Sequence, residues 1–153
     1  MLRKLQRREK DGQGGNFAIV ASKYNSRFVD SMLRAAQKEF RRSGASVSIV
    51  RVPGAYEIPL AAARLARTST ELSGIVCLGV ILRGETVHAE HIGREVSRAL
   101  MDIQIQHEVP VIHEVLLLEN AEQARKRCLD AKFNRGTEAA QTALAMARLM
   151  AGL

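Results

Sequence analysis

Aromatic residues are scarce in this 153-residue chain, where they make up 4% of the sequence and tryptophan does not occur. Alanine and other small aliphatic side chains must therefore fill the core, because protein interiors are close-packed. Long apolar runs are absent too, since no stretch approaches the roughly 18 uninterrupted apolar residues of a membrane-spanning helix. The sequence therefore predicts a protein that does not span a membrane.

Cysteine is nearly absent, since the chain contains only two, Cys77 and Cys128. They do not share the short spacing of metal ligands and do not suggest a disulfide framework. Cys77 lies in an apolar run and is expected to be a small buried side chain. The amino terminus lacks the apolar segment of a secretory signal. We therefore expect a cytoplasmic, reducing location.

Two glycine-rich motifs that bind nucleotides are also missing. Neither G-x-G-x-x-G nor G-x-x-x-x-G-K-[ST] occurs anywhere in the chain. Dinucleotide and ATP sites of the usual kinds are therefore disfavoured, and any ligand must be recognised in another way.

The charge is unevenly distributed, although the composition is that of a globular protein, with 46% hydrophobic and 25% charged residues. The formal net charge is +7, and much of the excess lies in the first ten residues, MLRKLQRREK. We expect residues 1–15 to form a basic, flexible tail with a glycine-rich joint and residues 16–153 to form a single domain. A nucleic-acid-binding module is not indicated, because such modules carry basic residues over one face of the folded body.

Short apolar runs alternate with longer amphipathic segments along the domain. Strands are predicted from the apolar or alternating runs, and helices from apolar residues at helical spacing. The predicted strands are Asn16–Ala21, Val47–Val52, Gly74–Ile81 and Val111–Leu118. The predicted helices are Arg27–Ser43, Pro59–Ser69, His88–Glu108, Ala121–Leu129 and Thr137–Met150, with Asn120 as a helix cap. The alternation indicates an α/β fold with a four-stranded parallel sheet covered by helices on both faces.

Ligands of such sheets bind beyond the carboxyl ends of the strands. The loop Pro53–Pro59 is stiffened by two prolines and can present backbone groups to a planar ligand. Gly84-Glu85-Thr86 precedes a predicted helix start, where unpaired N–H groups favour a phosphate. His88 falls in the first turn of that helix and can exchange protons with a bound substrate. His88 and His91 lack a third metal ligand, so no metal site is predicted.

Three segments together resemble the lumazine synthase family, which makes 6,7-dimethyl-8-ribityllumazine in the penultimate step of riboflavin biosynthesis. They are V-P-G-A-Y-E-I-P at Val52–Pro59, L-R-G-E-T-V-H at Leu82–His88 and E-N-A-E-Q-A at Glu119–Ala124, followed by Arg127. The resemblance extends from Asn16 to Met150. It implies a flavodoxin-like three-layer α/β/α sandwich and a transferase that condenses 5-amino-6-(D-ribitylamino)uracil with 3,4-dihydroxy-2-butanone 4-phosphate.

The resemblance also implies a role for individual residues. His88 matches the catalytic histidine, and no metal or organic cofactor is implied. The residues that match the pyrimidine- and ribityl-binding positions are Tyr24, Ala55, Tyr56, Glu57, Val80, Ile81, Leu82 and His113, the last supplied by an adjacent subunit. Those that match the phosphate- and butanone-binding positions are Glu85, Thr86 and Arg127, with the backbone N–H of Glu85 rather than its carboxylate facing the ligand.

The expected partners are the two small-molecule substrates and further copies of the chain. The family forms pentamers, some of which close into an icosahedral shell of sixty chains, and its active sites lie between subunits. Riboflavin synthase is a further expected partner, whereas nucleic acid and membranes are not.

Departures from the family pattern concern four places. His113 replaces a common phenylalanine, which weakens an apolar contact and offers a hydrogen bond. Ala89 replaces an aromatic residue and widens the pocket, and Arg135 stands where lysine is frequent. The segment Cys128–Asn134 departs most, in a region that influences assembly. None of these changes removes a group that the reaction needs.

Alternatives remain open at this level. A non-catalytic flavin- or lumazine-binding protein on the same scaffold would keep Tyr24 and Tyr56 without needing His88 and Arg127. An archaeal-type riboflavin synthase has no use for a phosphate-binding turn, because its lumazine substrates carry no phosphate. A nucleic-acid-binding module is supported only by the net charge.

Overall fold

A four-stranded parallel sheet forms the centre of the computed structural model, which describes residues 14–153. The spatial order of the strands is β2-β1-β3-β4, and Val20 of β1 lies between Val50 of β2 and Cys77 of β3. The strands are β1 (Asn16–Ser22), β2 (Ser46–Val52), β3 (Gly74–Leu82) and β4 (Val111–Leu118). The parallel α/β arrangement predicted from the sequence is therefore confirmed.

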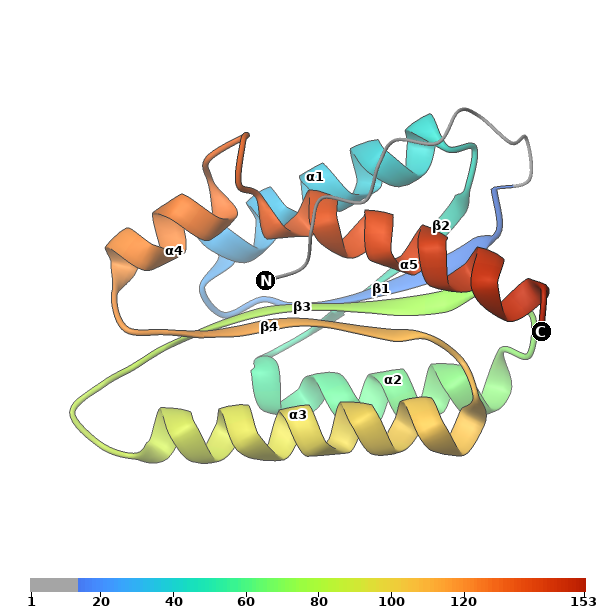
Figure 1. The fold of residues 1–153 in the computed structure, drawn as a ribbon. Coiled ribbons are helices and arrows are strands. Elements are labelled where there is room, and N and C mark those ends of the chain that lie inside the picture. The colour runs from blue at the N-terminus through green and yellow to red at the C-terminus, as the bar shows by residue number, and fades with distance from the viewer. Residues whose placement is uncertain (1–13) are drawn as a thin grey trace.

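Helices cover both faces of the sheet (Figure 1), which gives the three-layer sandwich. The helices are α1 (Ser26–Arg42), α2 (Ile58–Thr68), α3 (His88–His107), α4 (Ala121–Cys128) and α5 (Arg135–Ala151), with a single 3₁₀ turn, η1 (Ala55–Glu57), before α2. Figure 1 shows α2 and α3 on one face and α1, α4 and α5 on the other. Within residues 14–153, no helix combines the length and apolarity needed to cross a bilayer.

Most element boundaries differ slightly from those predicted, and side-chain caps fix the starts of two helices, α4 and α5. The N–H of Gln123 donates to Asn120 Oδ1 at 3.0 Å, which confirms Asn120 as the cap of α4. Asn134 caps α5 in the same way, since its Oδ1 accepts from Gly136 N at 2.8 Å. For this reason α5 begins at Arg135 rather than at the predicted Thr137.

Small residues allow the layers to pack closely, as the scarcity of aromatic residues required. A side chain at Gly136 of α5 would meet the backbone oxygen of Met32 in α1 at 2.0 Å, so only glycine fits there. The rings of Phe17 in β1 and Phe40 in α1 stack between the sheet and the helix, with their centroids 4.7 Å apart. Cys77 is buried in β3 as predicted, and burial raises the pKa of its thiol to about 12, which keeps it protonated.

The predicted basic tail and joint over residues 1–15 lie, except for Gly14 and Gly15, outside the described residues. The domain that follows carries its connecting loops at the carboxyl edge of the sheet, where the site was predicted. These loops join β1 to α1, β2 to α2, β3 to α3 and β4 to α4.

Candidate active site

A cavity of about 950 Å³ opens at the carboxyl edge of the sheet, between the ends of β1 and β3, the turn η1 and the start of α3. Most of the predicted site residues line this cavity. They are Tyr24, Ala55, Tyr56, Glu57, Val80, Ile81, Leu82, Thr86 and His88. Three loops far apart in the sequence thus meet at a concave surface, which is the usual form of a small-molecule site.

The loop after β1 is fastened to its neighbours by polar contacts. Asn25 has a left-handed backbone (φ 57°), and its Nδ2 donates to the carbonyl oxygen of Val80 at 2.7 Å. The N–H of Tyr24 donates to the carbonyl oxygen of Pro53 at 3.0 Å. The Tyr24 side chain is nevertheless 74% exposed, so its ring is free to stack on a planar ligand.

The loop after β2 is held by a local contact of its own. Glu57 Oε2 accepts from Gly54 N at 3.0 Å, and Glu57 N donates to the carbonyl oxygen of Gly54 at 3.2 Å. Pro59 then lies in the first turn of α2, where its missing N–H costs no helical hydrogen bond. The predicted stiffness of this loop therefore comes from a 3₁₀ turn as well as from its prolines.

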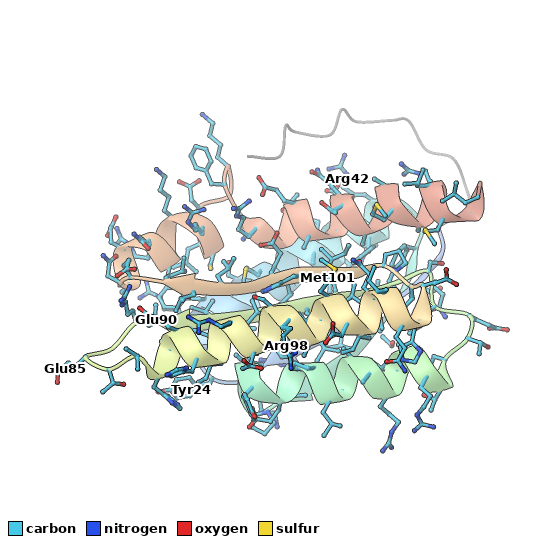
Figure 2. All side chains as sticks on the ribbon, turned by 60° about the horizontal axis from the view of Figure 1, so that its bottom comes forward. Tyr24, Arg42, Glu85, Glu90, Arg98 and Met101 are labelled. Atoms are coloured by element: carbon cyan, nitrogen blue, oxygen red, sulfur yellow. The ribbon has the colours of Figure 1, made fainter. Side chains whose placement is uncertain are left out.

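The loop after β3 is open and carries polar groups at the helix start. Thr86 Oγ1 accepts from the backbone N–H of His88 at 3.3 Å, and both residues line the cavity. Glu85 is exposed, does not line the cavity and points away from the body of the protein (Figure 2). The side chain of Glu85 is therefore not part of the cavity wall. Within residues 14–153, no cluster of three or more His, Cys, Asp or Glu side chains is arranged to hold a metal ion.

Two predicted site residues, His113 and Arg127, do not line the cavity of their own chain. His113 lies on β4, at the edge of the sheet, and Arg127 is exposed on α4, in the opposite helical layer from α3. The structure therefore does not bring these two residues together with His88 within one chain.

Both ring nitrogens of His113 have partners within the chain. Val115 N donates to His113 Nδ1 at 3.1 Å, so the neutral ring carries its proton on Nε2, which lies 2.7 Å from Ser97 Oγ. Ser97 Oγ can accept a hydrogen bond from Nε2 because its own hydroxyl donates to the carbonyl oxygen of Gly93 at 2.7 Å. Partial burial lowers the pKa of His113, which also favours the neutral ring. In this arrangement neither ring nitrogen is free for the additional hydrogen bond expected from the sequence.

Charged groups gather on the other side of β4. Burial raises the pKa of Glu114 to about 7, an effect that Arg135 and Arg127 oppose and that Glu138 reinforces. Arg135 Nη1 donates to Glu138 Oε2 at 2.6 Å, and this hydrogen bond is the main cause of the raised pKa of Arg135. Arg127 therefore lies near a carboxyl that is only partly ionised at neutral pH.

Sequence reasoning missed several residues of the cavity wall. Gly54 lies in the loop Pro53–Pro59, where it was not predicted as a site residue, and the left-handed conformation of Asn25 gives no sequence signal. His91 was weighed only as a metal ligand. Gly84 and Ala89, which the sequence pattern had already pointed out, also line the cavity, and the remaining lining residues are Ile92 and Glu95. The spacing of His88, His91 and Glu95 along one helix face is the signal that could have identified the last of these.

Known proteins match this chain over nearly its whole length. A family profile described as 6,7-dimethyl-8-ribityllumazine synthase matches residues 14–151. A protein of Stenotrophomonas maltophilia (strain R551-3) named 6,7-dimethyl-8-ribityllumazine synthase is 39% identical over 141 residues, 90% of each chain. A protein of the same name from Xanthomonas euvesicatoria pv. vesicatoria (strain 85-10) is 39% identical over 137 residues, 88% of each chain.

Proposed function

The chain belongs to the 6,7-dimethyl-8-ribityllumazine synthase family, and we propose that it catalyses the reaction for which the family is named. The substrates are 5-amino-6-(D-ribitylamino)uracil and 3,4-dihydroxy-2-butanone 4-phosphate, and the products are the lumazine, phosphate and water. The observation that carries the proposal is the cavity at the carboxyl edge of the sheet, where nine predicted site residues converge.

The pyrimidine and the ribityl chain bind between the first two loops in this proposal. The exposed ring of Tyr24 stacks on the pyrimidine. Backbone groups of Val80, Ile81 and Leu82, at the carboxyl end of β3, form hydrogen bonds with the polar edge of the pyrimidine. Ala55, Tyr56 and Glu57 contact the ribityl chain and the ring. Because these loops are already fastened to each other, little conformational freedom is lost on binding.

The amine of the aminouracil then attacks the ketone of the butanone phosphate and forms an imine with loss of water. Phosphate leaves next, and the helix-start turn at Glu85 and Thr86, together with Arg127, stabilises the charge that gathers on it. His88 accepts and returns protons during the elimination and the ring closure. Holding two substrates together supplies much of the rate, since effective molarities contribute about 7–11 kcal/mol in favourable cases.

The site is completed by a second copy of the chain in this proposal, because Arg127 and His113 lie away from the cavity of their own chain. We propose a cytoplasmic homo-oligomer built from pentamers. Members of the family also close such pentamers into icosahedral shells of sixty chains, and riboflavin synthase is the further partner that the family suggests. Free, buried thiols at Cys77 and Cys128 are compatible with a reducing compartment. Light scattering and negative-stain microscopy measure the assembly directly.

The activity is tested by mixing the purified protein with both substrates and following the appearance of lumazine fluorescence. Turnover is expected, with release of one phosphate for each lumazine formed. Binding of the pyrimidine without turnover would instead identify a non-catalytic binding protein. Turnover of lumazine itself without a phosphate substrate would identify a riboflavin synthase.

The shared site is tested by mixing two variants of reduced activity. We expect His88→Ala and Arg127→Ala chains, unfolded and reassembled together, to regain activity, because some interfaces then combine an intact His88 with an intact Arg127. Each variant reassembled alone is the control. If the mixture is no more active than the sum of the two controls, both residues act within one chain and the shared site is wrong.

A further inference from the structure

The loop between β3 and α3, Arg83–Val87, has few contacts that fix its shape. A side chain built at Gly84 would meet no atom within 4 Å, and Glu85 and Thr86 are exposed. Its contacts with its own helix are Thr86 Oγ1 with His88 N and Val87 O with His91 N. This loop nevertheless carries the turn proposed to bind phosphate, so something else must hold it.

Arg83, at the beginning of this loop, contacts two other elements at once. Its backbone N–H donates to the carbonyl oxygen of Leu118 at 2.8 Å, which extends the sheet by one residue. Its Nη2 pairs with Glu90 in the first turn of α3, and its Nη1 donates to Glu119 Oε1 at 3.1 Å after the end of β4. The contacts with Leu118 and Glu119 are the polar contacts by which the loop reaches beyond itself and α3 in the described part of the chain.

The guanidinium is therefore already engaged by two carboxylates, and the pKa of Arg83 is raised mainly by its hydrogen bond to Glu119. Neither Arg83, Glu90 nor Glu119 lines the cavity in which His88 and Thr86 lie. A cation that is neutralised in this way and placed outside the cavity is poorly suited to bind a phosphate directly. It is well suited to bridge the two ends of a loop, because the planar fork of arginine can serve two partners.

We propose that Arg83 is a positioning residue that closes the base of the phosphate-binding turn by bridging Glu90 and Glu119. This inference rests on the proposed function, since it assigns a role in binding the butanone phosphate. The bridge restricts the conformations of Gly84, Glu85 and Thr86 before the substrate arrives. Binding then costs less ordering of the loop, and the amides at the start of α3 are already directed toward the phosphate.

Replacing Glu90 or Glu119 distinguishes a positioning role of Arg83 from direct phosphate binding, because the two roles predict opposite changes in the KM for the butanone phosphate. Arg83→Gln raises the KM for the butanone phosphate about fivefold, the scale available from two exposed ion pairs, and leaves the KM for the aminouracil unchanged. Glu119→Gln and Glu90→Gln raise the same KM about twofold each, because each removes one arm of the bridge. If Arg83 bound phosphate directly, either substitution would free its charge and lower this KM, which overturns the proposal.

Conservative and control variants complete the test. Arg83→Lys retains the charge but not the fork, so it restores only part of the lost affinity. Arg98→Gln removes a similar charge from α3, where Arg98 pairs with Glu95 at 3.7 Å on the same helix, and leaves both KM values unchanged. An equal effect of Arg98→Gln would show that the net charge of α3, not the bridge, sets the affinity.

Hydrogen–deuterium exchange tests the bridge without relying on turnover. The amides of residues 84–87 exchange faster in Arg83→Gln than in the unmodified protein, whereas those of the loop Gly54–Glu57 do not change. Unchanged exchange at 84–87 overturns the bridge even in an active enzyme. Absence of turnover in the unmodified protein, with the exchange difference present, would overturn the proposed function and leave the bridge standing.

Discussion

The cavity and the β4 edge carry the predicted site residues in two different ways. Around the cavity, Tyr24 and Tyr56 belong to loops that are joined by a hydrogen bond within the chain, and His88 begins α3. The second region, called the β4 edge here, consists of β4 and the helix α4 that follows it. Its predicted site residues, His113 of β4 and Arg127 of α4, lie outside that cavity. The first region forms a cavity within one chain. The second presents an imidazole and a guanidinium group that do not line that cavity.

The difference motivates the proposed shared site, in which one chain supplies the cavity and a second copy supplies Arg127 and His113. Hydrogen bonds within the chain already join the loops after β1 and β2 to each other and to β3, so the geometry of the cavity depends in part on local and sheet contacts. Arg127 is exposed, and the nearby carboxyl of Glu114 has a raised pKa, so its charge is incompletely balanced in one chain. A phosphate held in a neighbouring cavity would balance it.

The largest expected effect lies at the cavity, at His88. We expect His88→Ala to lower kcat about 100-fold without abolishing turnover, because proton transfer is lost while the positioning of both substrates remains. His91→Ala is the matched control, since His91 lines the same cavity one helical turn further on. Steady-state kinetics measure both. A complete loss of turnover in a folded His88→Ala protein that still binds substrates would show that positioning of the substrates does not suffice for turnover without His88.

The next effect is expected at the β4 edge, at Arg127. Arg127→Ala should raise the KM for the butanone phosphate about 30-fold, as expected for loss of a hydrogen bond between charged groups. Arg125→Ala is the control on the same helix, where Arg125 pairs with Glu122 at 3.0 Å. If both variants behave alike, α4 contributes only its general charge and the contrast between the two regions disappears.

A smaller effect on stability is expected from Glu114, also at the β4 edge. Its pKa of about 7 exceeds the ordinary value of 4.5, so the folded state binds the extra proton and loses stability as the pH rises through this window. Glu114→Gln cannot ionise and should therefore be more stable than the unmodified protein by about 3 kcal/mol at pH 8, with little difference at pH 4.

Thermal or urea unfolding at the two pH values measures this difference. A stability gain that is equal at both pH values would show that packing, and not ionisation of Glu114, is responsible. A loss of stability at pH 8 would show that the carboxylate is instead needed by Arg127 and Arg135.

The smallest effect is expected at His113. His113→Phe should change the KM for the aminouracil by no more than about twofold, because both ring nitrogens already have partners within the chain and only the ring surface remains for a ligand. Ser97→Ala, which removes the partner of Nε2, is the companion variant. A large rise of this KM in His113→Phe would show that an imidazole nitrogen contacts the substrate after all.

Much of this organisation could be predicted because it is written locally. The continuous apolar run Gly74–Ile81 is typical of a strand buried on both faces, and the structure extends it by a single residue, to Leu82. Asn120 could be predicted as a cap because the geometry of a helix start is the same in any fold. The loop Pro53–Pro59 was predicted to be stiff, whereas its 3₁₀ turn was missed because a single such turn leaves no periodic pattern.

The sequence by itself determined the order of strands and helices, the family and the loops that form the cavity, because periodicity, turn residues and motifs act over short distances along the chain. Tertiary structure decided which side chains meet across long separations. Asn25 with Val80, Ser97 with His113 and Arg83 with Glu119 are such pairs. Each depends on the orientation of two backbones that only packing establishes, and no local pattern encodes that orientation.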